Sequence, residues 1–506
     1  MEQFGMCVAS AAAMTLATAV SLADTTTTDE ALRQIEELRQ QNAAMAQKIE
    51  KLERVATDDG AWLTEERTNQ IRSLVQDVLA DADTRSSLQS DGATAGWNKG
   101  FFLASPDGAY RLNIKGHIQF RWVFNQRSVP TGSLATGSAT GPESNYGFEN
   151  RRTRLVFSGT IIDPSLSYEI KPVWNRSATS GSTTQVNGSI EDIWVQKAFD
   201  GGLAIKAGQF KAPYLREELV SSSAQLAVER SLVNELFTMK FVQGIQVEWE
   251  QEMFRLQGFY GDSGRANGVN VVSTAATAGG YAGSFETDFQ TNQTAYALAG
   301  RAEYKAAGTW KQFKDFNSYR GDEFGLLFGL GGMGQNLRGN GIAQSASSMW
   351  GITGDVTANF GGWNVFAYGV YRGVTLGAPV MTRSGSMEEQ LGQYGFVVQS
   401  GVFVLDDLEL FGRYEYGNLD TDQYRTTANS REASLGRLSV ATIGFNLFPM
   451  GVANKDLKWT TDFGFALMPV GDFASSGADW KSDATEANGQ SSNHQFVLRS
   501  QIQLTF

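Results

Sequence analysis

The sequence of 506 residues has few of the residues that build metal and disulfide sites. It holds one cysteine, Cys7, and two histidines, His117 and His494. These numbers exclude a disulfide framework, a cysteine-based zinc site and an iron–sulfur cluster, and they leave two candidates at most for histidine catalysis. We therefore expect a protein that is not an enzyme and that binds neither a cofactor nor a metal.

Proline is scarce, with 9 residues, and charged residues make up only 19% of the chain. Average usage is about 5% proline and about 25% charged residues. Glycine is abundant, with 55 residues, and aromatic residues reach 11%. This composition favours many strands joined by tight turns, and it argues against both a helical enzyme and a disordered chain.

Long apolar runs are also missing, because none reaches the ~20 residues that a membrane-spanning helix needs. Yet 42% of the residues are hydrophobic, and the mean hydropathy is −0.26. A transmembrane β-barrel has this profile, since the side chains of each strand alternate between lipid and lumen. The net charge is −12, and the larger part of the chain, beyond residue 100, is nearly balanced. The absence of a basic field argues against a nucleic-acid partner.

Residues 1–23 have the features of a secretory signal peptide. The apolar stretch Cys7–Val20 precedes Ser21-Leu22-Ala23, which is a small-x-small cleavage motif. The first six residues carry no lysine or arginine, so the signal is atypical in its positive region.

Residues 24–60 are predicted to form a periplasmic coiled coil that holds several chains together. Within 29–56, apolar residues recur at heptad positions a and d, and the single Asn42 at an a position fixes the register. A lone amphipathic helix packed on the body is the alternative. Residues 61–100 are predicted to form a second helix, followed by a linker over 90–96.

From about residue 101 the period of the apolar residues changes from 3.6 to 2. In 111–124 apolar residues fill one face, while the other face holds three cations and His117. This strict alternation is typical of a barrel strand with lipid outside and water inside. The fold class is therefore all-β, a transmembrane antiparallel β-barrel of about sixteen strands over 101–506, preceded by the N-terminal α-helical coiled coil. Strands are predicted at 109–124, 148–161, 165–175, 189–199, 202–211, 240–250, 252–261, 294–306, 322–332, 348–360, 362–373, 393–404, 407–418, 436–448, 455–468 and 494–506.

Short and long connections alternate between these strands, as the periplasmic turns and outer loops of such barrels do. The last predicted strand ends on Phe506, which belongs to its apolar face. A terminal phenylalanine on an alternating strand resembles the assembly signal of Gram-negative outer-membrane barrels. We expect a multi-pass β-barrel in the outer membrane of a Gram-negative cell, surrounded by outer-membrane lipid.

Two segments of the predicted barrel carry a family resemblance. The first is Gly147-Phe148-Glu149-Asn150-Arg151-Arg152-Thr153-Arg154, ending at Gly159, and the second is Gly208-Gln209-Phe210-Lys211-Ala212-Pro213-Tyr214, continuing through Glu217-Glu218, Ser221-Ser222 and Glu229-Arg230-Ser231. Together they resemble the phosphate-selective porin O and P family. The resemblance implies a sixteen-stranded, homotrimeric anion channel whose third loop folds into the pore.

Cations on neighbouring strands could form a basic ladder on one inner wall, which would attract anions. Alternation along 148–161 places Asn150, Arg152 and Arg154 in the lumen and turns Arg151 outward near a rim. The candidate pore-lining, anion-binding residues are Lys115, Arg121, Arg152, Arg154 and Lys171. The alternative is that these are ordinary lumen charges, paired with Glu149, Glu169 and Asp192.

Residues 212–239 are the candidate constriction loop, and the alternative is an external loop packed over the barrel. Its candidate constriction residues are Arg216, Glu217, Glu218, Glu229 and Arg230. This mixture of signs predicts a transverse field, which is typical of general porins rather than of an anion trap. No dedicated lysine cluster can be placed, because Lys206, Lys211 and Lys240 are candidates only by position.

The sequence thus predicts an outer-membrane porin for passive diffusion of small hydrophilic solutes, with a preference for anions such as phosphate as the finer expectation. The expected partners are outer-membrane lipid, two further copies of the chain, and small hydrophilic solutes or inorganic anions. The alternative is a structural anchor that ties the barrel to the cell wall through the coiled coil.

Overall fold

The computed structural model describes two parts of the chain. In the N-terminal unit, up to Ser90, it describes residues 36, 40, 43–48 and 73. In the unit from Asp91 to Phe506, it describes 93–127, 143–176, 186–262, 264, 296–336, 346–382, 384–420, 436–470, 479–480 and 495–506.

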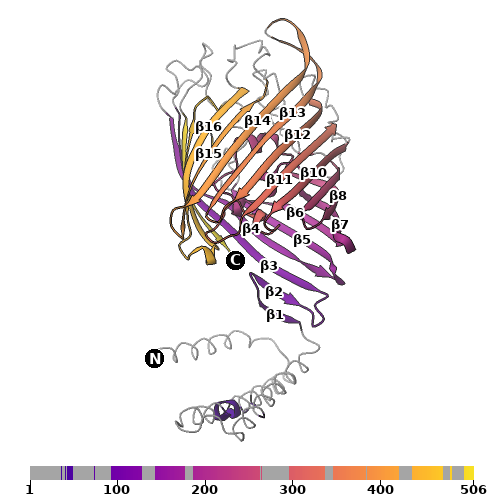
Figure 1. Cartoon of the computed structure of the whole chain (residues 1–506), viewed down its shortest axis with the longest axis vertical. Helices are drawn as coiled ribbons and strands as arrows, with labels where there is room; N and C mark the ends of the chain where they lie inside the picture. The colour runs from indigo at the N-terminus through magenta and orange to yellow at the C-terminus, as the bar shows by residue number, and fades with distance from the viewer. Residues whose placement is uncertain are drawn as a thin grey trace. The chain divides into compact units, whose positions relative to one another are not determined.

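The second unit is one antiparallel sheet of 18 strands. The last sixteen strands, β3 to β18, follow one another in chain order, and β18 pairs with β3, so the sheet closes into a barrel (Figure 1). Their bounds are β3 (Arg111–Arg127), β4 (Glu143–Ile161), β5 (Asp163–Arg176), β6 (Val186–Ala198), β7 (Leu203–Lys211), β8 (Phe241–Glu250), β9 (Phe254–Gly261), β10 (Tyr296–Ala307), β11 (Gly325–Asn336), β12 (Ala346–Asn359), β13 (Trp363–Met381), β14 (Met387–Phe403), β15 (Leu408–Asn418), β16 (Arg437–Leu447), β17 (Leu457–Ala466) and β18 (Phe496–Thr505).

The predicted closed barrel of sixteen antiparallel strands is confirmed, and each predicted strand overlaps an observed one. The prediction of a long outer loop over 374–392 is wrong. Instead β13 and β14 continue into this segment and pair up to Met381 and Met387. The segment is rich in polar residues and glycine and lacks the apolar/polar alternation that predicts a strand. Beyond the apolar band a barrel strand need not alternate, because it no longer faces lipid.

Two short strands precede the barrel. β1 (Thr94–Trp97) pairs with β2 (Phe101–Ala104), and β2 pairs with the first residues of β3. The predicted linker over 90–96 therefore ends in a strand. This hairpin continues the sheet at the end of the barrel where β18 stops.

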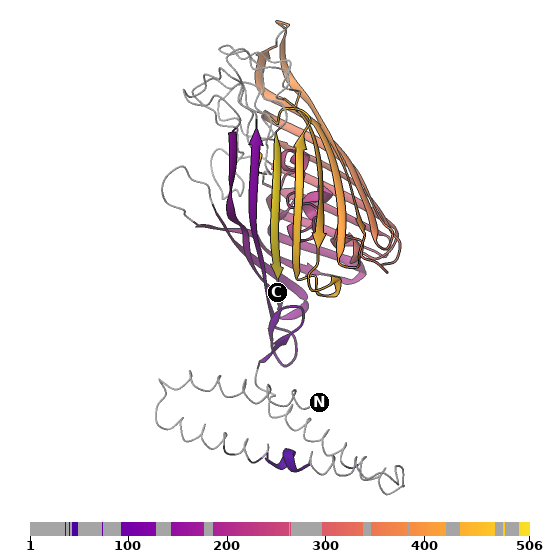
Figure 2. The ribbon, with the colours of Figure 1, turned by 90° about the vertical axis from the view of Figure 1, so that its left-hand side faces the viewer.

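Where the barrel closes, Gly116 on β3 pairs with Phe506, the residue that follows β18. The backbone N–H of Gly116 donates to the carbonyl of Phe506 at 2.7 Å, and the N–H of Phe506 donates back to Gly116 at 3.0 Å. A Cβ on Gly116 would lie 2.0 Å from the Phe506 ring, so a side chain at this position would displace the ring. Figure 2 shows the violet N-terminal strands beside the yellow C-terminal strands along this junction.

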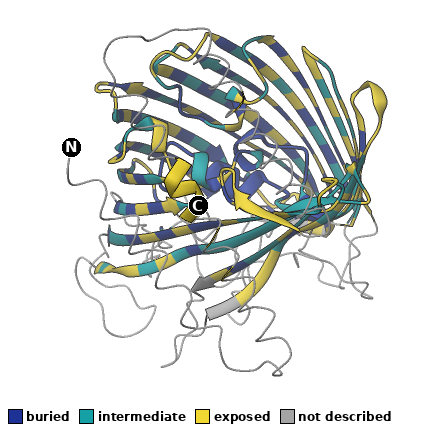
Figure 3. Cartoon of the chain, turned by 90° about the horizontal axis from the view of Figure 1, so that it is seen from below, coloured by how far each residue is buried: buried dark blue, intermediate teal, exposed yellow. Residues whose placement is uncertain are grey.

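Burial alternates along the strands in the inverse of the pattern of a water-soluble protein. On β3 the apolar Phe120 is 43% exposed, whereas the neighbouring Gln119 and Arg121 are 0% and 1% exposed. Figure 3 shows the same bands of buried and exposed residues on most of the strands. An apolar outer face and a polar inner face are what a bilayer requires of a barrel, because lipid satisfies no polar group.

The remaining predictions concern the N-terminal unit. The predicted signal peptide, 1–23, lies outside the described residues. Within the predicted coiled coil, residues 36, 40 and 43–48 are helical and exposed, and the rest lies outside the described residues. None of the helices among the described residues has the length and apolar character needed to cross a membrane.

Candidate functional site

The interior of the barrel is occupied by the segment between β7 and β8, residues 212–240 (Figure 3). It contains α4 (Arg216–Leu219), the short 3-10 helix η2 (Ser222–Ala224) and α5 (Leu232–Phe237). We call this segment the constriction loop. The Ser231 hydroxyl caps α5 by accepting the N–H of Asn234 at 2.9 Å. Leu226, Leu232 and Phe237 are each 1% exposed, so apolar burial fixes the loop as well as hydrogen bonds do.

The constriction loop bonds to inner side chains on several distant strands. Arg372 on β13 donates to the carbonyl of Leu236 at 2.9 Å, and Asp462 on β17 accepts the N–H of Val228 at 2.9 Å. On β18, Gln503 donates to the carbonyl of Ser223 at 3.0 Å. These contacts hold the loop inside the barrel, not over its mouth.

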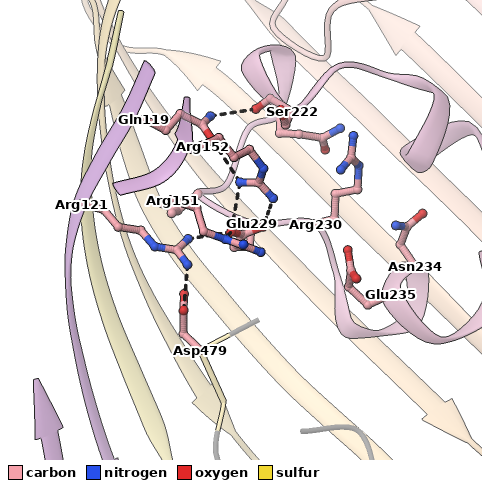
Figure 4. A network of polar contacts seen from close by, with 12 residues as sticks. Gln119, Arg121, Arg151, Arg152, Ser222, Glu229, Arg230, Asn234, Glu235 and Asp479 are labelled. Carbon is pink, nitrogen blue, oxygen red and sulfur yellow. Dashed lines mark hydrogen bonds and ion pairs between the residues drawn. The ribbon is translucent and has the colours of Figure 1, made fainter. Parts of the chain in front are cut away.

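Three arginines converge on one loop carboxylate, Glu229 (Figure 4). Arg121 and Arg151 each lie 2.6 Å from its Oε1, and Arg152 Nη2 lies 2.8 Å from its Oε2. Burial alone would raise the pKa of Glu229, but the charges of Arg151, Arg152 and Arg121 outweigh burial and hold that pKa well below its usual value. Glu229 is therefore a charged link between the loop and the wall formed by β3 and β4.

The orientation predicted for Arg151 is wrong, and a β-bulge is the reason. Gln119 on β3 lies opposite Arg152, but the next residue, Phe120, lies opposite Asn150. Arg151 is the extra residue, so it bonds to Glu229 inside the barrel rather than facing outward. The bulge also reverses the alternation before it. Asn150, predicted to face the lumen, lies opposite the lipid-facing Phe120 and is exposed.

Of the other predicted wall cations, Arg154 contacts the constriction loop, and Lys171 and Lys115 lie away from it. Arg154 bonds to Ser222 of the loop and lies 2.5 Å from Glu191 on β6. Lys171 contacts Asp192 and lies 3.2 Å from Glu169. Lys115 lies apart from these residues, exposed near the start of β3 and beside Gly100. The structure thus brings together Arg121, Arg152 and Arg154 around the loop, and it leaves Lys115 and Lys171 elsewhere.

The predicted charges of the loop are buried anchors. Arg216 donates to Thr357 Oγ1 at 3.1 Å and lies 3.3 Å from Glu303. Glu217 accepts the Ser231 hydroxyl at 2.6 Å and the Tyr368 hydroxyl at 3.0 Å.

The remaining loop pair is internal to the loop. Glu218 lies 3.6 Å from Arg230 Nη1, and it accepts Asn234 Nδ2 at 2.8 Å. Burial would raise the pKa of Glu218, but Arg230, Lys211 and Lys240 lower it to about 2. Arg230 also donates to the Val220 carbonyl at 2.8 Å, so its guanidinium closes the turn between α4 and α5.

Several residues that hold the loop were not singled out from the sequence. Alternation marks the strand residues that contact the loop as facing inward, but nothing local says which inner residue meets a loop that is far away in the chain. They are Tyr368, Arg372, Arg413, Lys458 and Asp462. Glu191, Asp479 and Arg499 act one step further away, because they bond to Arg154, Arg121 and Asp462.

The described residues contain no group of three histidine, cysteine, aspartate or glutamate side chains that could hold a metal ion. His117 is 7% exposed on the inner wall and lies opposite Arg154 in the β-ladder. His494 lies outside the described residues. The described part of the site consists of buried ion pairs and polar inner side chains.

A closed barrel with an apolar outer belt, a polar interior and a loop folded into its lumen defines a porin. A sequence model of the phosphate-selective porin O and P family matches residues 135–464, which is more than half of the chain. The chain belongs to this family. It is an outer-membrane porin of Gram-negative type that lets small hydrophilic solutes diffuse across the membrane.

Solved structures of the same architecture come from several bacteria. The outer membrane channel DcaP of Acinetobacter baumannii shares 12% identity, with 82% of this chain and 100% of that chain covered and a TM-score of 0.47. The anion-selective porin from Comamonas acidovorans shares 13% identity over 78% and 99%, with a TM-score of 0.46. Salmonella typhi OmpF in complex with daunomycin shares 13% identity over 82% and 100%, with a TM-score of 0.47. No curated protein matches the sequence.

Proposed function

We propose that this porin is a general diffusion pore with a weak preference for anions, and that it is not a phosphate trap. One observation carries the proposal. Four of the five wall cations predicted to bind anions, Arg121, Arg152, Arg154 and Lys171, already contact a carboxylate of the protein.

An anion that bound to this wall would compete with those carboxylates. Arg121 and Glu229 are 1% and 3% exposed at the side chain, so the ion pair that they form is desolvated. Separating such a pair is costly, because it leaves a buried charge without a partner. A dissolved phosphate ion would also have to shed water, and it would meet arginines whose donors are already in use. The arginines therefore contribute mainly to loop position and only weakly to ion selectivity.

Single-channel recording in planar bilayers under a KCl gradient tests this proposal. We expect weakly selective conductance steps with a reversal potential slightly on the chloride side, unchanged when phosphate is added. A strongly chloride-selective current that millimolar phosphate blocks would overturn the proposal and make the arginine wall an anion trap.

We further propose that three chains assemble through the coiled coil predicted over 24–60, and that transport is passive, with no catalytic step. The apolar a and d positions with Asn42 support assembly. In full-length protein, replacing Leu38 and Met45 by aspartate should shift the mass measured by light scattering in detergent from trimer to monomer. An unchanged mass would place the trimer contacts on the barrel alone.

The structural alternative, an anchor to the cell wall, makes a different prediction. An anchor should co-sediment with purified peptidoglycan through residues 24–100 and should show no channel activity. Conductance of the full-length chain, retained after those residues are removed, would support the pore and reduce the N-terminal unit to an assembly or tethering device.

A further inference from the structure

We propose that solutes do not pass through the centre of the barrel but along the inner wall of β5 to β9, and that Lys206 on β7 is the cation that gives this path its anion preference. The inference rests on the pore function proposed above and adds the route and its selecting residue. It follows from a comparison of burial around the inner wall.

The inner face of β10 to β18 is sealed. Side chains that point inward there are almost without solvent contact although many are polar. Thr357 is 1% exposed, Arg372 is 1%, Gln393 is 0% and Gln399 is 2%. Water and solutes cannot reach a wall whose polar side chains are covered to this degree.

The constriction loop provides one part of the seal. Val233 in α5 donates its N–H to Glu415 on β15 at 3.1 Å, and a Cβ on Gly395 of β14 would lie 2.8 Å from the Val233 side chain. The loop therefore packs directly against these strands, because no space remains between them for a water layer.

A second segment provides the other part of the seal, from the end of the barrel that holds Phe506. Residues 308–324 join β10 to β11, and Phe313 and Phe316 within them are 3% and 1% exposed. The Phe316 N–H donates to the Ala224 carbonyl of the loop at 3.1 Å, and its ring lies 4.6 Å from the ring of Phe366 on β13. The loop and this segment thus meet and form a partition along one side of the lumen.

Part of the inner face of β5 to β9 keeps solvent contact, although Gln209 and Gln246 on that face are 6% and 3% exposed. The side chains of Lys171 and Glu169 on β5 are each 22% exposed, and that of Arg255 on β9 is 19% exposed. Glu250, at the end of β8, is 42% exposed at the side chain. We call this face the open wall. It is the part of the described lumen where a hydrated solute can travel beside charged groups.

Lys206 differs from the other cations of the open wall. Lys171 contacts Asp192, and Arg255 lies 2.8 Å from Glu250 and 3.2 Å from Glu303. Among the described residues Lys206 has no hydrogen bond or ion pair, and its Nζ lies 4.8 Å from the Trp194 ring and 5.4 Å from the Phe210 ring. The two rings hold the ammonium without a direct salt bridge, while the carboxylates of Glu248, Asp192 and Glu169 act on its charge from a distance. No carboxylate occupies its donors, so a passing anion can still contact it. The chemistry fits a small inorganic or carboxylate anion.

Cysteine modification in bilayers tests the route. In a Cys7→Ser background, the Lys206→Cys and Gln257→Cys variants place a thiol on the open wall, and the Gln399→Cys and Gln501→Cys variants place one on the sealed wall, where both glutamines are 2% exposed. A negatively charged methanethiosulfonate reagent should reduce the conductance of the first pair and leave the second pair unchanged. Block of the sealed-wall variants with no effect on the open-wall variants would overturn the route. Absence of conductance in the Cys7→Ser background would instead contradict the pore function itself.

Charge substitution tests the role of Lys206. Lys206→Gln should lower the chloride-to-potassium permeability ratio by about two-fold, since it removes a cation of the path that makes no direct ion pair, and Lys206→Arg should restore it. Lys197→Gln is the matched control, because Lys197 carries the same charge but pairs with Asp163 and lies opposite Leu166 and the lipid-facing Ile205. A ratio that Lys206→Gln leaves unchanged, in protein that still shows folded, heat-modifiable migration, would overturn the assignment.

Discussion

Two parts of the inner wall, β3 with β4 and the open wall of β5 to β9, have the same sequence pattern but different roles. The wall around β3 and β4 and the open wall of β5 to β9 both alternate apolar outer residues with charged inner residues. On the first wall, Arg121 and Arg152 are buried against Glu229 of the constriction loop. On the second wall, Lys171 and Glu169 form a half-solvated pair that faces the lumen. The difference is created by the loop, which covers one wall and leaves the other in water.

This comparison changes how an arginine-rich strand in such a barrel is interpreted. Inner cations of a porin are usually assigned to the attraction of anions. When a loop carboxylate lies among them, the same cations become its binding site. The charge of these cations then stabilises the position of the loop. Ion selectivity is determined instead by cations that the loop does not contact.

The largest effect is expected from Glu229→Gln. The change removes the charge that three arginines share. Arg121 keeps Glu149 and Asp479, but Arg152 loses the carboxylate that it contacts in a buried site, which should lower the free energy of unfolding by about 3–5 kcal/mol. The loop should detach from β3 and β4, and the single-channel current should become larger and noisier. Urea unfolding followed by tryptophan fluorescence, together with bilayer recording, measures both effects.

The matched control for that variant is Glu169→Gln, which makes the same change on the open wall. Its carboxylate is 22% exposed, so we expect a much smaller loss of stability and no increase in current noise. Equal losses in the two variants would show that the loop is not held by Glu229.

The next effect in size is expected from Arg152→Ala combined with Arg154→Ala. The double variant keeps Arg121 and Arg151 on Glu229, so the loss of stability should be smaller than for Glu229→Gln. As loop anchors, the two arginines should affect current noise more than reversal potential. If they line the solute path as the sequence suggested, the double variant will instead lose its anion preference while the current stays quiet.

Much of this architecture could be predicted from the sequence. Period-2 alternation and the spacing of turns place all sixteen barrel strands, because lipid imposes that pattern on each strand independently of its neighbours. The insertion of the loop between β7 and β8 is implied by the family resemblance and not by its length, because the connection over 262–293 is longer. The direction of Arg151 could not be predicted, since one extra residue at a bulge reverses the alternation without leaving a local signal. The partners of the arginines depend on a contact between residues more than seventy positions apart.

A pH effect of moderate size separates the loop from the open wall. The pKa of Glu218 is lowered to about 2 by Arg230, Lys211 and Lys240 against the effect of burial, while an unfolded glutamate has a pKa of about 4.3. A lowered pKa in the folded state means that this carboxylate stabilises the fold fully above about pH 4.3, and that its contribution is lost as the pH falls toward 2.

We therefore expect a quiet current between pH 7 and pH 5 and increasing noise as the pH falls from about 4 toward 2, where Glu218 becomes protonated. Single-channel recordings at stepwise lower pH measure this onset. Glu218→Gln should bring loop noise to neutral pH. Noise that begins near pH 6 in the unmodified protein would point to a titrating group outside the loop.

The smallest effect is expected from Lys171→Gln on the open wall. Its side chain is 22% exposed, so solvent screens its contacts with Asp192 and Glu169, and the free energy of unfolding should change by no more than about 1 kcal/mol. The permeability ratio should also shift less than in Lys206→Gln, because the donors of Lys171 are occupied by Asp192 and Glu169 and are not free for a passing anion, whereas Lys206 makes no direct ion pair among the described residues. Bilayer recordings of the two variants in the same salt gradient make the comparison. A larger shift for Lys171→Gln would mean that paired charges control selectivity on the open wall, and the distinction between paired and unpaired cations would then fail.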